Sequence, residues 1–437
     1  MNHSITYREM DRAADETPAG LVACHECDAL HRLERLTPGQ TAHCHRCSAE
    51  LYRDARHDVD EALAYTTAAA IAFVIANFFP FLGLKLAGRI EENIVASGVV
   101  ALTKSGQIEL GVLVALTSII FPAVTLLGLL WILLPLKLGK FPPFAATVFR
   151  IITALGPWTL MGVFMLGVLI AFVKLGDLAT IVPGVSLFAF AALMLFAAAA
   201  TSKFDSSMVW PPQGPSMDVP DGVTTARQAG LSHCHTCRLL VLPDDHGAAQ
   251  NDAFPREHGH CPRCASALHA SRAVNSVGRT WALVIAAAVL CIPANVYPVM
   301  TVIQFGQGDP STIMGGVILL IQQDMFGLAF VVFFASIAVP VLKLALLIFL
   351  LVSVQRRSPW RPKDRTLLYR VTEVVGAWSM VDIFLVGILS AIVQLGALAT
   401  IEPGIGASFF GAVVVVTMFA AKSFDPRLIW DHAAERE

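Results

Sequence analysis

The sequence has few charged residues for its length. Of its 437 residues, 15% are Asp, Glu, Lys or Arg, 55% are hydrophobic, and the mean hydropathy is +0.64. A soluble domain usually carries about a quarter charged residues. The net charge of −2 provides no basic excess of the kind that indicates nucleic-acid binding. This balance predicts a membrane protein.

Several functional motifs are also missing. Residues 1–20 are polar and acidic and contain no apolar signal-peptide core, so we expect the first hydrophobic segment to serve as the insertion signal. The sequence has no Walker A motif, which argues against ATP as the energy source. It has no Ser-His-Asp, Cys-His or paired-carboxylate arrangement at a plausible spacing. We therefore expect a protein that is not an enzyme.

The two halves of the chain are similar to each other. Ala-Asn-Phe-Phe-Pro ends at Pro80 and Ala-Asn-Val-Tyr-Pro ends at Pro298, an offset of 218 residues. Leu-Gly-Asp-Leu-Ala-Thr-Ile-Val-Pro-Gly at 175–184 corresponds to Leu-Gly-Ala-Leu-Ala-Thr-Ile-Glu-Pro-Gly at 395–404, an offset of 220. A near-constant offset along a whole half predicts a duplicated unit.

Hydrophobic runs predict about four membrane spans in each half, because a bilayer core requires about 20 apolar residues per helix. The predicted fold class is an all-α polytopic membrane protein of two tandem parallel repeats, with two small cytosolic zinc-ribbon (rubredoxin-like) modules formed by the four Cys-x2-Cys pairs within 24–47 and 234–264. The shorter apolar stretches 94–104 and 312–322 are interpreted as interfacial or re-entrant helices. The expected spans are 63–87, 110–135, 147–173 and 183–202 in the first half, and 281–305, 327–353, 372–394 and 403–421 in the second.

The distribution of Lys and Arg predicts the sidedness of the chain. Segments 355–370 and 135–150 are basic, whereas 88–94 and 304–312 are poor in Lys and Arg. We therefore expect both termini and both cysteine clusters in the cytoplasm. The expected boundaries are 1–60 for the N-terminal region with the first ribbon, 61–205 for the first bundle, 206–230 for a linker, 231–272 for the second ribbon, 273–425 for the second bundle and 426–437 for a cytosolic tail.

Eight of the nine cysteines form four Cys-x2-Cys pairs, grouped into two clusters. Two such turns can supply four thiolates to a tetrahedral Zn²⁺, which is a closed, structural type of site. Metal binding would also supply much of the folding energy of such short modules. We expect two zinc ions, one held by Cys24, Cys27, Cys44 and Cys47, the other by Cys234, Cys237, Cys261 and Cys264.

Other interpretations of the cysteines remain open. Iron also binds four thiolates, and spacing does not exclude it. A Cys-x2-Cys pair can instead be the redox couple of a thiol oxidoreductase. Against that hypothesis, the pairs come in twos, their predicted side is cytoplasmic, and no thioredoxin-like βαβ pattern surrounds them. The ninth cysteine, Cys291, is expected to be a small apolar residue within its span.

The duplicated combination of a ribbon, Ala-Asn-x-[Phe/Tyr]-Pro and Leu-Gly-x-Leu-Ala-Thr-Ile-x-Pro-Gly closely resembles the paraquat-inducible protein A family (PqiA/LetA) of Gram-negative bacteria, from Cys24 to Trp430. The resemblance implies a multi-pass inner-membrane protein. It further implies a partner, an MCE-domain protein that forms a periplasmic tunnel, and a role in passing phospholipids between the inner membrane and that tunnel. A proton-coupled transporter of small solutes is the alternative.

Ionisable residues inside a span cost about 2.5–3.5 kcal/mol on insertion scales and so indicate function. Lys343 and Asp382 lie in the middle of predicted spans in the second half, where the first half has Thr125 and Gly162. We expect them to pair and to gate a lipid-loading cavity; an ion pair that only joins two helices is the alternative. The expected neighbours in this polar network are Ser336, Ser379, Thr417 and Glu373.

Two further sets of polar residues occur in the spans. Lys174 and Asp177 have i,i+3 spacing and are either a functional pair or a solvated helix end. The pairs Asn77/Pro80 and Asn295/Pro298 are expected to kink or break their helices, because proline lacks an N–H and clashes with the preceding turn. Asparagine can then satisfy the freed backbone groups.

Overall fold

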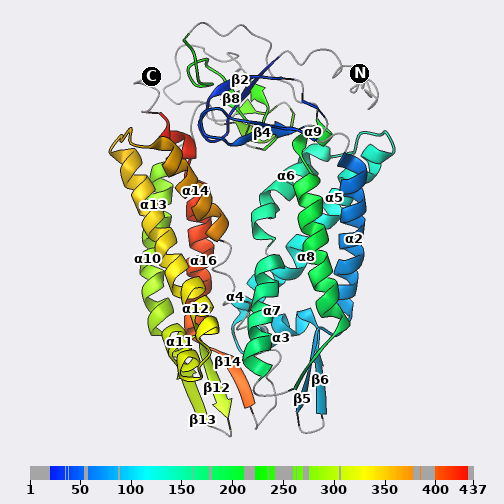
Figure 1. The fold of residues 1–437 in the computed structure, drawn as a ribbon, viewed down its shortest axis with the longest axis vertical. Helices are drawn as coiled ribbons and strands as arrows, with labels where there is room; N and C mark the ends of the chain where they lie inside the picture. The colour runs from blue at the N-terminus through cyan, green and yellow to red at the C-terminus, as the bar shows by residue number, and fades with distance from the viewer. Residues whose placement is uncertain are drawn as a thin grey trace.

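A computed structural model gives the fold as two helical bundles side by side (Figure 1). The short strands of the two cysteine modules lie at one end of the bundles, and two small β-sheets lie at the opposite end (Figure 1). The structure describes residues 20–34, 36–37, 39–53, 58–86, 89–159, 161–176, 180–210, 222–234, 236–241, 259–261, 263–268, 275–304, 307–376, 384 and 399–431.

In the first bundle, α2 (Val59–Phe78) packs against α8 (Val185–Lys203) through a stripe of small side chains. Ala62, Ala69 and Ala76 are fully buried along α2. Small residues at this spacing allow two membrane helices to approach closely. The other elements of this half are β5 (Leu82–Leu86), β6 (Arg89–Asn93), α3 (Val95–Lys104), α4 (Ile108–Ala115), η2 (Leu116–Ile120), α5 (Phe121–Lys137), α6 (Ala145–Leu155), η3 (Gly156–Trp158), α7 (Met161–Gly176), β7 (Thr180–Pro183) and α9 (Ser206–Val209).

The second half follows nearly the same order of elements. α10 (Ser276–Val296) packs against α16 (Ile405–Ser423) as α2 packs against α8. The other elements of this half are β12 (Met300–Gln304), β13 (Gln307–Ser311), α11 (Ile313–Gln322), α12 (Phe326–Phe333), η4 (Phe334–Ala338), α13 (Val339–Gln355), α14 (Pro362–Gly376), β14 (Ala399–Pro403) and η6 (Pro426–Ile429).

Each bundle carries a three-stranded antiparallel sheet at the end away from the cysteine modules. β5 pairs with β6 and β7, and β12 pairs with β13 and β14. The expectation of an all-α membrane region is therefore wrong at this end. In each half the Thr-Ile-x-Pro part of the repeated motif contributes to the third strand, immediately before the last long helix. The sheet thus ties the start of that helix to the end of the first span.

The predicted first spans, 63–87 and 281–305, are too long. α2 ends at Phe78 and α10 at Val296, each two residues before a proline. Proline cannot donate a helical hydrogen bond, so the apolar residues beyond it form β5 and β12. The side chains of Asn77 and Asn295 donate to the carbonyl oxygens of Phe73 and Cys291, each at 2.8 Å, in the last turn of these helices.

Seven helices among the described residues are long and apolar enough to cross a membrane. They lie within or overlap seven of the eight predicted spans. Most of the remaining span, 372–394, falls outside the described residues after α14 ends at Gly376. The predicted span 147–173 is interrupted at Gly156–Trp158, where Pro157 lacks a backbone donor. The expected short helices between the first and second spans are present as α3 and α11.

A π-helical turn precedes a proline in the second span of each half. η2 comes before Pro122, and η4 comes before Pro340. Each proline leaves the carbonyl four residues earlier without its helical donor, and that residue is Ser118 or Ser336. Both serines are buried, and their hydroxyls have no hydrogen-bond partner in the described part of the chain. π-Helical turns inside helices are frequent at functional sites.

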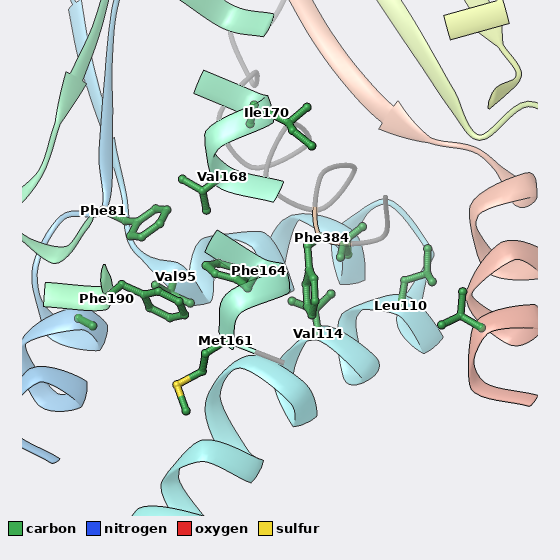
Figure 2. Close-up of a cluster of buried hydrophobic side chains, with 14 of the residues drawn as sticks. Phe81, Val95, Leu110, Val114, Met161, Phe164, Val168, Ile170, Phe190 and Phe384 are labelled. Carbon is green, nitrogen blue, oxygen red and sulfur yellow. The ribbon is translucent and has the colours of Figure 1, made fainter. Parts of the chain in front are cut away.

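The two bundles meet in an apolar core that contains residues of both (Figure 2). Phe164 of α7 packs between Phe190 of α8 and Phe384, with ring centroids 4.9 and 5.4 Å apart. A polar contact adds to this core, because the Ser408 hydroxyl of α16 donates to the side-chain oxygen of Gln107. The two halves are therefore in contact within the bundles, away from the cysteine modules.

Candidate metal centres and the buried lysine

The eight paired cysteines form two compact clusters, all with buried side chains. Each set of four sulfurs lies within 4.8 Å of one another. In the first cluster Cys24 Sγ lies 3.4 Å from Cys47 Sγ, and Cys27 Sγ lies 3.5 Å from Cys44 Sγ. The second cluster repeats this cross-pairing, with 3.5 Å between each pair: Cys234 with Cys264, and Cys237 with Cys261.

Local backbone geometry explains how each Cys-x2-Cys turn presents its two thiols. The residue after the second cysteine has a positive φ in all four turns, although none of these residues is glycine. Its N–H bonds back to the carbonyl of the first cysteine, as Asp28 N does to Cys24 O at 2.9 Å. This closes the turn and directs both sulfurs to one side. The four residues are Asp28, Ser48, Arg238 and Ala265.

The clusters fit a tetrahedral metal ion. Four ligands about 2.3 Å from a Zn²⁺ lie about 3.8 Å from one another, close to the sulfur separations of 3.4 and 3.5 Å. The short contacts join one Cys-x2-Cys pair to the other, whereas a redox couple would join the cysteines within a pair. All nine cysteines are free thiols in the structure. The two clusters can each hold a metal ion.

Hydrogen bonds between the clustered thiols change their pKa values. Hydrogen bonds from neighbouring thiols lower the pKa of Cys44, Cys47 and Cys234, and the same sharing of protons raises the pKa of Cys27 and Cys237. A low pKa favours the thiolate, the form that binds metal. His31 Nε2 also lies 3.3 Å from Cys44 Sγ. His31 was not predicted from the sequence, because its distance from the cysteine pairs follows no ligand spacing.

Each cysteine module contacts the bundle of the other half. Arg370 of α14 donates to Glu26, which lies between Cys24 and Cys27, and to the carbonyl oxygen of Cys47 at 2.9 Å. In the first bundle, Arg150 of α6 donates to the carbonyl oxygen of Ala265 in the second module at 3.4 Å. The two arginines correspond at an offset of 220.

The membrane site centres on Lys343 of α13, whose side chain is only 2% exposed. Its Nζ donates to Thr417 Oγ1 of α16 at 3.3 Å, and Thr417 in turn donates to the carbonyl oxygen of Val414. A Cβ atom at Gly376 would lie 2.5 Å from this Nζ. The absence of a side chain at Gly376 of α14 therefore makes room for the ammonium group.

The structure describes some of the other predicted polar residues and not others. Ser336 lies in the π-helical turn η4, seven residues before Lys343. Glu373 is exposed near the end of α14, and Lys174 belongs to the last turns of α7. Asp382, Ser379 and Asp177 lie outside the described residues. The structure thus brings Lys343 and Thr417 together, and the pairing of Lys343 with Asp382 stays a prediction.

Membrane-length helices with two four-cysteine clusters at one end define a polytopic membrane protein with two candidate metal centres. The chain belongs to the family described as Paraquat-inducible protein A, whose model matches residues 59–213 and again 277–434. The two matched segments are the two bundles with their flanking residues.

Curated relatives cover almost the whole chain. It is 32% identical to Intermembrane transport protein PqiA of Escherichia coli strain K12, over 95% of this chain and 97% of that protein. It is 30% identical to Lipophilic envelope-spanning tunnel protein A of the same strain, over 95% and 93%. A Probable intermembrane transport protein of Haemophilus influenzae is 25% identical over 94% and 96%. No solved structure is significantly similar to the chain.

Proposed function

We propose that this chain is the inner-membrane component of a system that passes phospholipid between the inner membrane and a periplasmic tunnel formed by an MCE-domain protein. The observation that carries the proposal is its similarity, over 95% of its length, to a protein named for intermembrane transport. The name of a second relative refers to a lipophilic tunnel that spans the envelope, which supports the same class of function. The chain acts as a transporter component and not as an enzyme.

In this proposal the chain is a duplicated unit, with the domain boundaries expected from the sequence. The similar order of elements in both halves and the position of both cysteine modules at one end support it (Figure 1). The predicted span 372–394 then crosses the membrane, because an even number of spans in each half returns the chain to the side of the modules. That side is the cytoplasm, as the basic segment 355–370 favours.

The proposed ions are two zinc ions, one in each four-cysteine cluster. The closed, buried sulfur sets leave no position for a substrate or water, so the ions would be structural. Their task is to fold two short modules that hold the ends of the bundles. Metal analysis would distinguish zinc from iron.

The proposed working site is in the second bundle, where Asp382 pairs with Lys343. Lys343 is buried shortly after the π-helical turn η4, and such turns are frequent at functional sites. Protonation of Asp382 would remove its charge and free the ammonium group, which lies against Gly376. The change would open a lipid-loading cavity, with Ser336, Ser379, Thr417 and Glu373 as polar neighbours. Lys174 and Asp177 are a second candidate pair in the first half.

The direct test is to purify the chain from its native membrane, identify co-purifying proteins, and analyse bound lipids by mass spectrometry. The proposal expects an MCE-domain partner and phospholipid at stoichiometric amounts. If neither the partner nor the lipid is recovered, the proposed function is contradicted. Metal analysis of the same sample addresses the thiol oxidoreductase alternative, since about two tightly held zinc ions per chain would leave no free thiol pairs to cycle. A small-solute transporter would lack both the lipid and the partner.

A further inference from the structure

A cavity of about 670 Å³ is lined neither by the eight clustered cysteines nor by Lys343. It lies where the second turn of the first cysteine module meets the segment before the second module and the start of α14. Its volume falls in the range of small-molecule sites. The lining residues that could recognise a ligand are His45, Arg46, Arg361, Lys363, Asp364 and Trp430.

The charge of this lining is positive. Arg46, Arg361 and Lys363 bring three cationic groups, and Asp364 brings the single carboxylate. Arg361 pairs with Asp364 at 3.4 Å with both side chains exposed, so this pair is weak. Lys363 has no ion pair among the residues that the structure describes. The lining therefore attracts an anion.

Both guanidinium groups lie over the face of a tryptophan ring. Arg46 lies over the ring of Trp430 at 4.8 Å, and Arg361 lies over the ring of Trp360 at 5.6 Å. A stacked guanidinium loses little freedom when its N–H edge binds phosphate, often through two parallel hydrogen bonds. Arg361 also has a φ of +38°. A non-glycine residue in that conformation is strained, and such strain clusters at binding sites.

The cavity lies near the end of a membrane-length helix. α13 ends at Gln355, and the loop from Arg356 to Arg361 connects it to the lining residues of α14. Trp360 in this loop is 58% exposed. Exposed tryptophan next to arginine is typical of the membrane–water interface. This places the cavity at the level of lipid headgroups on the side of the cysteine modules.

We propose that this cavity binds a phosphate group, supplied by an anionic phospholipid headgroup or by a soluble phosphate compound. Arg361 and Lys363 bind the phosphate oxygens, Arg46 adds positive potential, and Asp364 limits the affinity. The site is independent of the proposed transport function, because it lies apart from Lys343 and uses none of the residues of that network.

The test compares two double variants of the full chain in detergent. Arg361→Gln with Lys363→Gln removes two charges from the lining, and all four of Arg356, Arg357, Arg361 and Lys363 are exposed, so folding should be preserved. Arg356→Gln with Arg357→Gln removes two charges from the same loop without touching the lining. Binding of dioleoylphosphatidylglycerol is measured by native mass spectrometry, and binding of inorganic phosphate by calorimetry.

The lining variant should weaken binding about fivefold for each charge removed, and the loop variant should weaken it much less. Asp364→Asn should strengthen binding. If the lipid alone shows this pattern, the site takes a headgroup; if inorganic phosphate also shows it, the site takes soluble phosphate as well. Equal binding of both probes by the wild type and the lining variant, or equal losses in the two double variants, would overturn the proposal.

Discussion

Arg370 Nε lies 2.9 and 3.0 Å from the two carboxylate oxygens of Glu26, although 344 residues separate the two in the sequence. Glu26 is only 8% exposed and lies inside the first Cys-x2-Cys turn, whereas Arg370 belongs to α14 of the second bundle. The contact therefore fixes the first cysteine module to the second half of the chain. Arg150 makes the corresponding, weaker contact between the second module and the first bundle.

Glu26→Gln should loosen the first module. The substitution keeps the size of the side chain and removes the charge that Arg370 binds, and a hydrogen bond to a charged group contributes about 2 kcal/mol. We expect metal release from the purified chain to a chelator to become about thirtyfold faster. Arg150→Gln is the matched control, because its single bond is 3.4 Å long. Equal release rates in wild type and Glu26→Gln would contradict a docking role.

Metal content should follow the cysteine clusters. Cys44→Ser removes one of four thiolates from the first cluster, so the purified chain should retain about one zinc ion in place of two. Cys291→Ser should retain both, because Cys291 belongs to neither cluster. Elemental analysis of the three proteins measures this directly. Loss of metal from Cys291→Ser, or no metal in the wild type, would refute the assignment.

Gly376→Ala should impair transport while the chain remains folded. The added methyl group would lie 2.5 Å from Lys343 Nζ, and the flexible end of the lysine can move away from it without a shift of the backbone. The displaced ammonium would no longer reach Thr417 or its expected partner Asp382. Gly156→Ala is the equivalent change in the first half, where nothing lies within 4 Å of the new methyl group. Cell-envelope function and membrane abundance should be measured for both variants, and equal activity would exclude the gating role.

Ser336→Ala should leave folding unchanged or stabilise it by up to about 1 kcal/mol. Its buried hydroxyl has no hydrogen-bond partner in the described part of the chain, so removal relieves a desolvation cost. Ser118→Ala should behave alike in thermal unfolding, because Ser118 is equally buried in the corresponding turn. Only Ser336→Ala should reduce transport, since only the second bundle has a buried lysine, Lys343, after this turn; the first bundle has Thr125 there. Clear destabilisation by either substitution would mean that its hydroxyl is bonded in the membrane.

The sequence predicted the parts of this protein that depend on composition and spacing. The four Cys-x2-Cys pairs predicted two clusters, and apolar runs located seven of the described helices. The strands β5 and β12 were missed because their apolar residues continue directly from a span, so hydropathy could not separate strand from helix. Only Pro80 and Pro298 indicated the end of each helix.

Contacts between distant segments could not be predicted from spacing. Glu26 and Arg370 belong to separate modules, and nothing near either residue specifies the other. A signal did exist, because Arg150 and Arg370 occupy the same place in the two halves, at an offset of 220 residues. The buried position of Lys343 was predictable from its apolar neighbours, whereas the space at Gly376 depends on the packing of α14 against α13.

The most direct test of the proposed function is the movement of labelled phospholipid between the inner and outer membranes of cells whose own copy of this protein has been removed. We predict that the wild-type chain restores transfer. Lys343→Ala and Asp382→Asn, tested separately at normal membrane abundance, should each fail to restore it. No change in transfer on restoring the wild-type chain would contradict lipid transport, and full transfer by both variants would contradict the role of the charged pair.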